Sequence, residues 1–380
     1  MIALLALFLA GCADPVLPDA AWYDCGALNT DHPRAAQYQE IIDDLLATGA
    51  PSVSAAVISP EGSWAGAGGQ VDLIQGIDAR SCHRYPFASV TKMFAASTVM
   101  TLVEDGALSL DAPAREHLPA EVVERVANAD TATIRQLLQH TSGVPEYVTM
   151  GYYLDAFDQA LPMSTVIDEL SYIYGLKADF EPGAGLSYSN SNYLLLSLII
   201  EDITGETAYD VVRSRVLDPL GLESTMGRSE QPDAVSRGYA DLRGNGEWVD
   251  QTEVSASVMA SPGKLDGGLI STPLEVATLL EALGDGALVS AESLEEMQAF
   301  QTYDEIDGLE DAYGLGLARI QTQHGEAWGH YGGLYPFSSL AYHFPDHDTT
   351  VVVVVSGWSD ALSEWGTSEA AYDIVLSSGR

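Results

Sequence analysis

The sequence is poor in positive charge. Its 380 residues include 16 Lys and Arg against 55 Asp and Glu, which gives a formal net charge of −39. Only three of these residues are lysines, Lys92, Lys177 and Lys264. A surface of this charge argues against nucleic acid and anionic lipid surfaces as partners, because both are themselves negatively charged. The composition predicts a soluble acidic surface of a kind that suits a saline habitat.

Long apolar runs are also missing, except at the N-terminus. Residues 1–11 are apolar and end directly before Cys12. This arrangement predicts a bacterial lipoprotein signal with Cys12 as the lipidated residue, so that the chain is exported to the cell envelope and held at a membrane by a lipid anchor. An ordinary secretory signal and a buried N-terminal helix are the alternatives. No later run is long enough to span a bilayer, and the aperiodic residues 12–33 are typical of a tether.

Cysteine is scarce as well. Besides Cys12, the chain has only Cys25 and Cys82, and its eight histidines are scattered. No pair of these residues has the spacing of zinc ligands, so we expect no metal site. Export to an oxidising compartment would permit a disulfide between Cys25 and Cys82. Two unpaired buried thiols are the alternative, and the residues favour neither.

Apolar alternation predicts strands near both ends of the chain. Residues 52–59 and 63–73 form one predicted hairpin, and residues 338–344 and 349–356 form another. Five consecutive valines at 351–355 are typical of a buried strand.

Helical periodicity predicts the elements that surround these strands. The expected helices cover residues 38–46, 93–105, 133–140, 163–174, 191–204, 207–216 and 368–377. The helix at 191–204 is apolar on nearly every side, which predicts that it is buried. Thr272, followed by Pro273 and Glu275, predicts one more helix start with a capping box.

Strands at both ends with helices between them predict an α/β (α+β) fold. One antiparallel sheet, flanked by helices, is then built from both ends of the chain, and a helical region is inserted into it. We expect the folded domain at 34–380, with an α/β part at 34–108 and 255–380 and a helical part at 109–254. A chain with 47% hydrophobic residues can fill one large domain of this kind or two intimate ones.

The sequence at 89–92 places a hydroxyl, Ser89, and an amine, Lys92, three residues apart. On a helix such positions share one face, and the start of a helix favours developing negative charge. A serine becomes a nucleophile when a base removes its proton, and a lysine can be that base when burial or nearby positive charge keeps its amine neutral. An isolated pattern of this kind more often marks a helix cap and a solvated lysine.

Two further motifs follow in order. The sequence Y-S-N stands at 188–190, and H-Y-G-G stands at 330–333. With S-x-x-K at 89–92, they resemble the serine β-lactamase and penicillin-binding-protein superfamily, in the branch of class C β-lactamases, DD-peptidases and related esterases. Further segments resemble the same branch, at 87–92, 134–143, 181–183, 218–222 and 267–272. The resemblance extends over roughly residues 35–375 and implies the β-lactamase/transpeptidase-like fold.

The resemblance implies an active site in a cleft between the two parts of the fold. Ser89 would be the nucleophile, and Lys92 would be its general base or would hold Tyr188 as a phenolate. Tyr188 would deliver a proton to the leaving group, and Asn190 would hold Lys92 and bind a substrate amide. A packed tyrosine and a turn or helix cap are the alternatives for Tyr188 and Asn190.

The third motif departs from the family pattern. His330 stands where many relatives carry lysine, and it would bind substrate charge or tune Tyr188. Tyr331 replaces the usual hydroxyl residue, which weakens the expectation that a β-lactam or peptide carboxylate is recognised. Gly332 would let substrate lie close to the strand, and the backbone N–H of Gly333 would complete an oxyanion hole with that of Ser89.

Two other features receive structural interpretations. His140 begins a His-Thr-Ser-Gly segment that shapes a turn after a helix in the family, so we expect no catalytic role for it. The acidic stretch at 304–311 lacks the pattern of a cation-binding loop and is expected to be a solvated loop.

The sequence therefore predicts a serine hydrolase that acts through a Ser89 acyl-enzyme on an amide or an ester, without a cofactor or metal. The expected activity is that of a D-alanyl-D-alanine carboxypeptidase-like or β-lactamase-related hydrolase. Its substrate would be a small peptide or ester, such as a peptidoglycan stem peptide. An esterase for small acyl esters and a penicillin-binding sensor that acylates without turnover are the alternatives.

Overall fold

The computed structural model describes residues 21, 25, 31–157, 165–227, 230, 233–259, 261, 263–302, 310–360, 362 and 370–377. The predicted signal at 1–11, the lipidation site Cys12 and most of the predicted tether at 12–33 lie outside the described residues, so they stay predictions. In the described part of the chain, no helix combines the length and the apolar character that crossing a bilayer requires.

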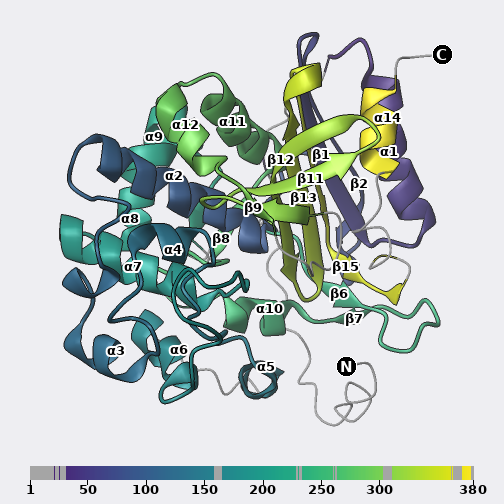
Figure 1. Cartoon of the computed structure of the whole chain (residues 1–380). Helices are drawn as coiled ribbons and strands as arrows, with labels where there is room; N and C mark the ends of the chain where they lie inside the picture. The colour runs from purple at the N-terminus through teal and green to yellow at the C-terminus, as the bar shows by residue number, and fades with distance from the viewer. Residues whose placement is uncertain are drawn as a thin grey trace.

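An antiparallel sheet runs through the molecule, on the right in Figure 1. Within the described residues it has nine strands in the order β3-β2-β1-β14-β13-β12-β11-β10-β9. The strands are β1 (Ser52–Ser59), β2 (Gly62–Asp72), β3 (Ile77–Asp78), β9 (Gln301–Thr302), β10 (Glu310–Tyr313), β11 (Ala318–Thr322), β12 (Gly325–Leu334), β13 (Phe337–Phe344) and β14 (Thr349–Val355). Strand β1 pairs with β14, with Val53 opposite Val355, so both ends of the chain join one sheet, as predicted.

The five valines of β14 explain the central place of this strand. Each is at most 1% exposed, and successive side chains point to opposite faces of the sheet. Val351, Val353 and Val355 pack in the cluster that includes Tyr38 of the N-terminal helix, whereas Val352 and Val354 pack in the cluster of the helical region. A continuous apolar run is what a strand buried on both faces requires.

Helices from the two ends of the chain cover one face of the sheet. Helix α1 (Ala35–Ala47) and helix α14 (Ala370–Leu376) lie next to each other there, in purple and yellow in Figure 1. The buried residues of α1 are Tyr38, Ile41, Ile42 and Leu45, which form the face that the periodicity predicts.

Helix α11 (Pro273–Gly284) packs on the opposite face, against β1, β13 and β14. The Thr272 hydroxyl accepts the backbone N–H of Glu275, as the predicted cap requires. The Glu275 carboxylate does not return the bond. It accepts instead from the Ser224 backbone N–H at 2.7 Å and from the Thr225 hydroxyl at 2.6 Å, so it ties α11 to a neighbouring loop.

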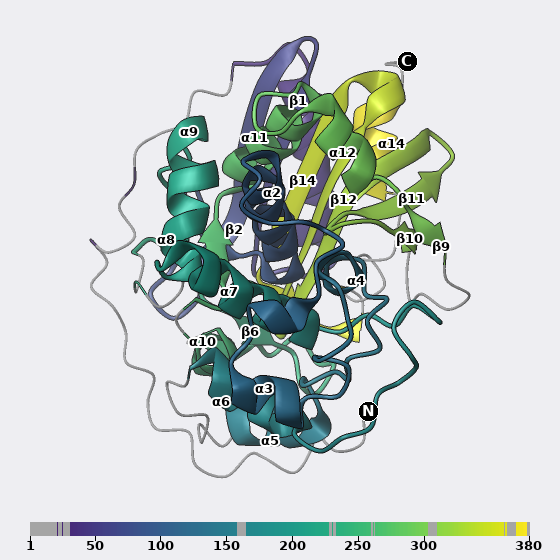
Figure 2. The ribbon, with the colours of Figure 1, turned by 60° about the vertical axis from the view of Figure 1, so that its left-hand side comes forward.

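The inserted helical region lies on the same side of the main sheet as α11 (Figures 1 and 2). Besides α11, the described helices on this side include α2 (Thr91–Glu104), which precedes the region, α3 (Ala120–Arg125), α4 (Ile134–Leu138), α5 (Met150–Phe157), α6 (Val166–Leu170), α7 (Ser191–Thr204), α8 (Ala208–Val212), α9 (Asp218–Leu220), α10 (Thr252–Val258) and α12 (Ala291–Met297). Helix α7 has the predicted bounds, and its first ten residues are all buried. The predicted helix at 207–216 is present, as α8 followed without a break by a π-helix at Arg213–Leu217.

Two small sheets connect the main sheet to the helical region. The order in one is β15 (Gly357–Trp358), β6 (Tyr239–Ala240), β7 (Val249–Asp250), and in the other β4 (Tyr85–Pro86), β8 (Leu269–Ser271), β5 (Met226–Gly227). The Phe87 backbone N–H donates to the Leu269 carbonyl at 3.2 Å, which joins β8 to the segment that leads into α2.

Cys25 and Cys82 are linked by a disulfide, the first of the two arrangements that the sequence left open.

Candidate active site

Ser89 lies in the tight turn Ala88–Val90, which runs directly into α2. Ala88 has a φ of +48°, a left-handed conformation that is uncommon outside glycine and that clusters at functional sites. Strand β12 packs on this turn through Gly332, where a Cβ atom would collide with the carbonyl oxygen of Phe87. Glycine at 332 therefore lets the turn that carries Ser89 pack closely on β12, and the approach of substrate to this strand stays a prediction.

Lys92 is one helical turn from Ser89 and is fully buried. Its Nζ donates to Ser89 Oγ at 3.0 Å, to Asn190 Oδ1 at 2.7 Å and to the backbone oxygen of Asp266 at 2.6 Å. Burial lowers the pKa of Lys92 to about 8, although the carboxylates of Asp266 and Glu146 oppose the shift. A neutral amine in this position would keep two N–H donors on Asn190 and Asp266 and turn its lone pair to the Ser89 hydroxyl.

Tyr188 precedes α7, and Lys92 Nζ lies 4.9 Å from the centroid of its ring. Its hydroxyl is buried and makes no hydrogen bond within the part of the chain that the structure describes. Burial raises the pKa of Tyr188 well above its ordinary value, and the nearby Ser89 hydroxyl only partly opposes this effect. The phenol is therefore neutral at rest, which disfavours the alternative that Lys92 holds it as a phenolate.

Asn190 is oriented by Glu146, a residue that the sequence motifs do not identify. Glu146 Oε2 accepts the backbone N–H of Asn190 at 2.6 Å and its side-chain Nδ2 at 3.0 Å. These bonds turn the amide so that its oxygen faces Lys92. Burial raises the pKa of Glu146, while the N–H bonds from Val148 and Asn190 lower it.

His330 is buried in β12, and both of its ring nitrogens have hydrogen-bond partners. Its side chain is 2% exposed, its Nε2 lies 2.7 Å from the Tyr313 hydroxyl, and its Nδ1 lies 2.5 Å from the Tyr331 carbonyl oxygen. Burial, with a contribution from Lys92, lowers the pKa of His330 to about 3. A neutral imidazole with both nitrogens hydrogen-bonded does not supply the positive charge that we expected to bind substrate or to tune Tyr188.

Tyr313 of β10 contacts Tyr188 and His330, which belong to two of the motifs, and no sequence pattern marks it. Its ring lies 4.6 Å from that of His140 and 5.9 Å from that of Tyr188, as measured between centroids. The His140 ring also contacts the Tyr188 ring, at 4.3 Å between centroids, and its Nδ1 accepts the backbone N–H of Ser189 at 3.1 Å. Its φ of +59° fits the expected structural role in a turn. The neutral aromatic cluster fixes Tyr188 without charge.

Tyr331 and Glu310 form one edge of the site. A Cβ atom at Gly333 would lie 3.1 Å from the Tyr331 ring, so this ring covers the strand beside Gly333. Glu310 Oε1 accepts the backbone N–H of Tyr331 at 2.8 Å and the hydroxyl of Tyr342 at 2.6 Å. Residues 304–309 of the acidic stretch lie outside the described residues, but Glu310 begins β10 and is only 13% exposed, so it is not part of a solvated loop.

The structure thus brings Ser89, Lys92, Tyr188 and Asn190 into one group, with His330 and Gly333 on the adjacent strand β12. Among the residues that the structure describes, no three of His, Cys, Asp or Glu gather in a way that would hold a metal ion. The arrangement can take a proton from a hydroxyl with a buried amine and can give one from a neutral phenol.

Comparison with known proteins identifies the family. The model of the Beta-lactamase family matches residues 38–370, most of the chain. The chain belongs to the Beta-lactamase family. Its curated relatives include penicillin-binding protein 4* of Bacillus subtilis, which is 28% identical over 302 residues, 77% of this chain and 65% of the relative. Protein flp of Staphylococcus aureus is 29% identical over 158 residues, 41% of this chain and 30% of the relative. The matches thus span less than two thirds of either relative.

Solved structures confirm the predicted fold. A D-stereospecific amidohydrolase from Streptomyces sp. is 27% identical with a TM-score of 0.75, and the match covers 90% of this chain and 98% of that one. The D-amino acid amidase of Ochrobactrum anthropi SV3 in complex with D-phenylalanine is 25% identical with a TM-score of 0.76, covering 90% and 97%. The octameric penicillin-binding protein homologue of Pyrococcus abyssi, at 24% identity and a TM-score of 0.76 over 90% and 77%, supports the fold alone.

Proposed function

We propose that the protein is a serine hydrolase that cleaves an amide or ester through an acyl-enzyme at Ser89. The observation that carries the proposal is the fully buried amine of Lys92, 3.0 Å from Ser89 Oγ, with its pKa lowered to about 8. Lys92 accepts the Ser89 proton as Oγ forms a bond to the substrate carbonyl carbon. The backbone N–H groups of Ser89 and Gly333 stabilise the resulting oxyanion, and each such donor lowers the barrier by roughly 3–4 kcal/mol.

Tyr188 is the proposed proton donor to the leaving group. Its neutral phenol gives a proton to the departing nitrogen or oxygen as the bond to the carbonyl carbon breaks. The Lys92 ammonium then passes the proton that it took from Ser89 to the Tyr188 phenolate, which restores the phenol and the neutral amine. Water then attacks the acyl-enzyme, which releases the acid and restores Ser89. The high pKa of Tyr188 supports this order, because a phenol that holds its proton at rest is ready to donate it.

The charges around the site support a substrate without a carboxylate beside the scissile bond. His330 is neutral, and the ionisable neighbours that influence Lys92 are three carboxylates, Asp266, Glu146 and Glu310, and one ammonium. A substrate carboxylate would meet repulsion here and no free cation among the described residues. We therefore propose an amide of a small amino acid or short peptide as substrate, with D-configuration at the acyl residue. The D-specific amidases among the structural relatives support that choice.

A D-alanyl-D-alanine carboxypeptidase is the second candidate, favoured by the similarity to penicillin-binding protein 4*. An esterase for small acyl esters would use the same site. One panel separates the three: D-phenylalanine amide with its L-enantiomer, a peptide that ends in D-alanyl-D-alanine, and p-nitrophenyl butyrate, with Ser89→Ala as the control. We expect the D-amide to be cleaved fastest. A preference for the D-alanyl-D-alanine peptide, or turnover that survives Ser89→Ala, would contradict the respective part of the proposal.

We further propose that the protein is an exported lipoprotein anchored through Cys12. The linked Cys25 and Cys82 support export, because disulfides persist in oxidising compartments. Expression with an alkyne-tagged fatty acid tests the anchor, with Cys12→Ser as the matched control. We expect label on the wild-type protein only, in the membrane fraction; an unlabelled wild-type protein in the soluble fraction would refute the anchor.

A further inference from the structure

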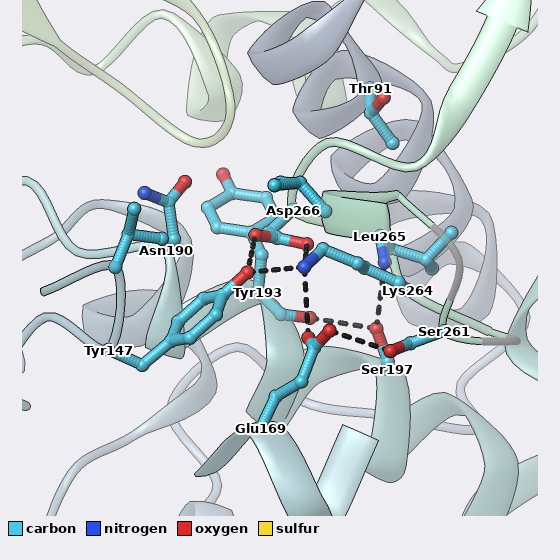
Figure 3. A network of polar contacts seen from close by, with 12 residues as sticks. Thr91, Tyr147, Glu169, Asn190, Tyr193, Ser197, Ser261, Lys264, Leu265 and Asp266 are labelled. Atoms are coloured by element: carbon cyan, nitrogen blue, oxygen red, sulfur yellow. Dashed lines mark hydrogen bonds and ion pairs between the residues drawn. The ribbon is translucent and has the colours of Figure 1, made fainter. Parts of the chain in front are cut away.

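A second lysine is buried close to the first. Lys264 is 4% exposed, and its Nζ donates to Glu169 Oε2 at 2.9 Å and to the hydroxyl of Tyr147. It also lies 3.9 Å from Asp266 Oδ1. Figure 3 shows this amine between the two carboxylates and the phenol. Two of the three lysines in the sequence, Lys92 and Lys264, are thus buried in this part of the molecule.

Asp266 connects this group to Lys92. Its backbone oxygen accepts a hydrogen bond from Lys92 Nζ at 2.6 Å, while its Oδ2 accepts one from the Tyr147 hydroxyl at 2.7 Å. Tyr147 directly follows Glu146, the residue that orients Asn190. Besides Ser89, the Lys92 amine donates to Asn190 and Asp266. Asn190 is held by the residue next to Tyr147, and Asp266 is bonded to Tyr147 itself, so both are linked to the group around Lys264.

Charges buried in this way reduce stability unless they are well paired, and apolar side chains of similar size often stabilise a protein as well or better. Glu169 is also satisfied by the Ser261 hydroxyl at 2.6 Å, so the cluster is closely bonded on more than one side. A buried charge cluster near the Lys92 amine thus has an effect that apolar packing could not reproduce: a carboxylate and an ammonium both act on the pKa of that amine.

We propose that Lys264 is a positioning residue for the acylation of Ser89: through the Tyr147 hydroxyl it holds the Asp266 side chain, so that the Asp266 carbonyl stays against the Lys92 amine, and its ammonium offsets the negative charge there. The inference rests on the proposed function, in which Lys92 is the base. The two charges act on Lys92 in opposite directions. Burial is the main cause of its lowered pKa, the Asp266 carboxylate raises that pKa, and the Lys264 ammonium lowers it.

Lys264 keeps its own proton throughout. Burial favours the neutral amine, but the Asp266 and Glu169 carboxylates outweigh it and raise the pKa of Lys264. The other titratable groups that face Lys92 are Glu146, Glu310, Tyr188, Tyr193, His140 and His330. The histidines are neutral at physiological pH, and the tyrosines hold their protons, because burial lowers the histidine pKa values and raises the tyrosine ones.

Two variants with opposite expected effects test the inference. The readout is the pH at which kcat/KM for p-nitrophenyl acetate reaches half its plateau on the acidic side. Lys264→Met removes the ammonium, which lowers the pKa of Lys92, so this midpoint is expected to move up. The expected shift is roughly one pH unit, the order of magnitude of one partly screened charge interaction inside a protein. Asp266→Asn retains the backbone carbonyl and a hydrogen-bond acceptor for Tyr147, and it is expected to move the midpoint down.

Two further variants serve as controls. Lys177→Met removes the exposed third lysine and should leave the midpoint in place. Lys264→Arg retains the positive charge, so its midpoint should lie much closer to that of the wild type than the midpoint of Lys264→Met does. A purely structural role would lower the melting temperature of the Lys264 and Asp266 variants without moving the midpoint in opposite directions.

The inference is overturned if both Lys264→Met and Asp266→Asn keep the wild-type midpoint. If Lys264→Met does not fold, Asp266→Asn decides alone: a downward shift supports the inference, and an unmoved midpoint overturns it. Ser89→Ala, assayed in parallel, separates the two proposals. Turnover that survives in this variant defeats the proposed function and the inference with it, whereas lost turnover with unmoved midpoints overturns the inference only.

Discussion

Replacing Gly332 with alanine is expected to damage catalysis far more than folding. A Cβ atom at this position would collide with the carbonyl oxygen of Phe87 and with the Ser339 hydroxyl, both inside the closest approach that real Cβ atoms show. The turn that carries Ser89 must then move back from β12 by about 1 Å, and a displacement of this size costs roughly 100-fold in rate. Overpacking of this kind lowers the free energy of unfolding by about 1–3 kcal/mol, which a chain of this size can tolerate.

The assay compares kcat/KM and the melting temperature of Gly332→Ala with those of Gly284→Ala. A Cβ atom at Gly284, at the end of α11, would meet only ordinary contacts at 3.8 Å from His343 and Trp328. We expect a loss of about 100-fold in kcat/KM for Gly332→Ala, with most of the folded protein retained, and no loss for Gly284→Ala. A Gly332→Ala variant with wild-type kcat/KM would refute the view that β12 positions the nucleophile.

Three other predictions follow from the charges in the structure. Lys92 has a pKa of about 8 and must be neutral to act as a base. We therefore expect kcat/KM to rise with pH to a plateau above pH 8 and to fall about tenfold per pH unit below it. A flat profile from pH 6 to 9 would contradict this assignment. Glu146→Ala should free the Asn190 amide and lower kcat/KM by about tenfold, as the loss of hydrogen bonds to a charged group predicts. Glu146→Gln should retain most of the activity. Equal rates in both variants would exclude the orienting role of Glu146. The formal charge of −39 should make the melting temperature rise between low and high salt as ions screen the repulsion, so an unchanged melting temperature would show that the acidic surface has no effect on stability.

The fold could be predicted from the sequence where local patterns and final packing agree. The valines of β14 and the first ten residues of α7 are buried, and the lack of polar faces in these segments indicated this directly. The hairpins at both ends were predictable for the same reason. Short elements were missed, such as α3 and β9, because a few residues carry too little periodicity to distinguish them from loops.

The candidate site could be predicted only where residues stand in a motif. Ser89, Lys92, Tyr188 and Asn190 lie together as the three-motif pattern implies. Glu146 and Tyr313 could not be found, because they reach the site through tertiary contacts and no spacing in the sequence marks them.

Lys264 carried one usable signal, its rarity in a chain with three lysines. The charge of His330 was wrongly expected, because protonation depends on burial and on the neighbouring Lys92, and neither is visible in the motif.

The central claim is that Ser89 attacks the substrate with Lys92 as its base. Acid-quenched mixtures of the protein with D-phenylalanine p-nitrophenyl ester, analysed by intact mass and peptide mapping, test it most directly. The account predicts a transient acyl adduct on the peptide that contains Ser89, formed more slowly below pH 8 in keeping with the pKa of Lys92, and absent in Ser89→Ala. An adduct on another residue, or turnover by Ser89→Ala at the wild-type rate, would contradict the account.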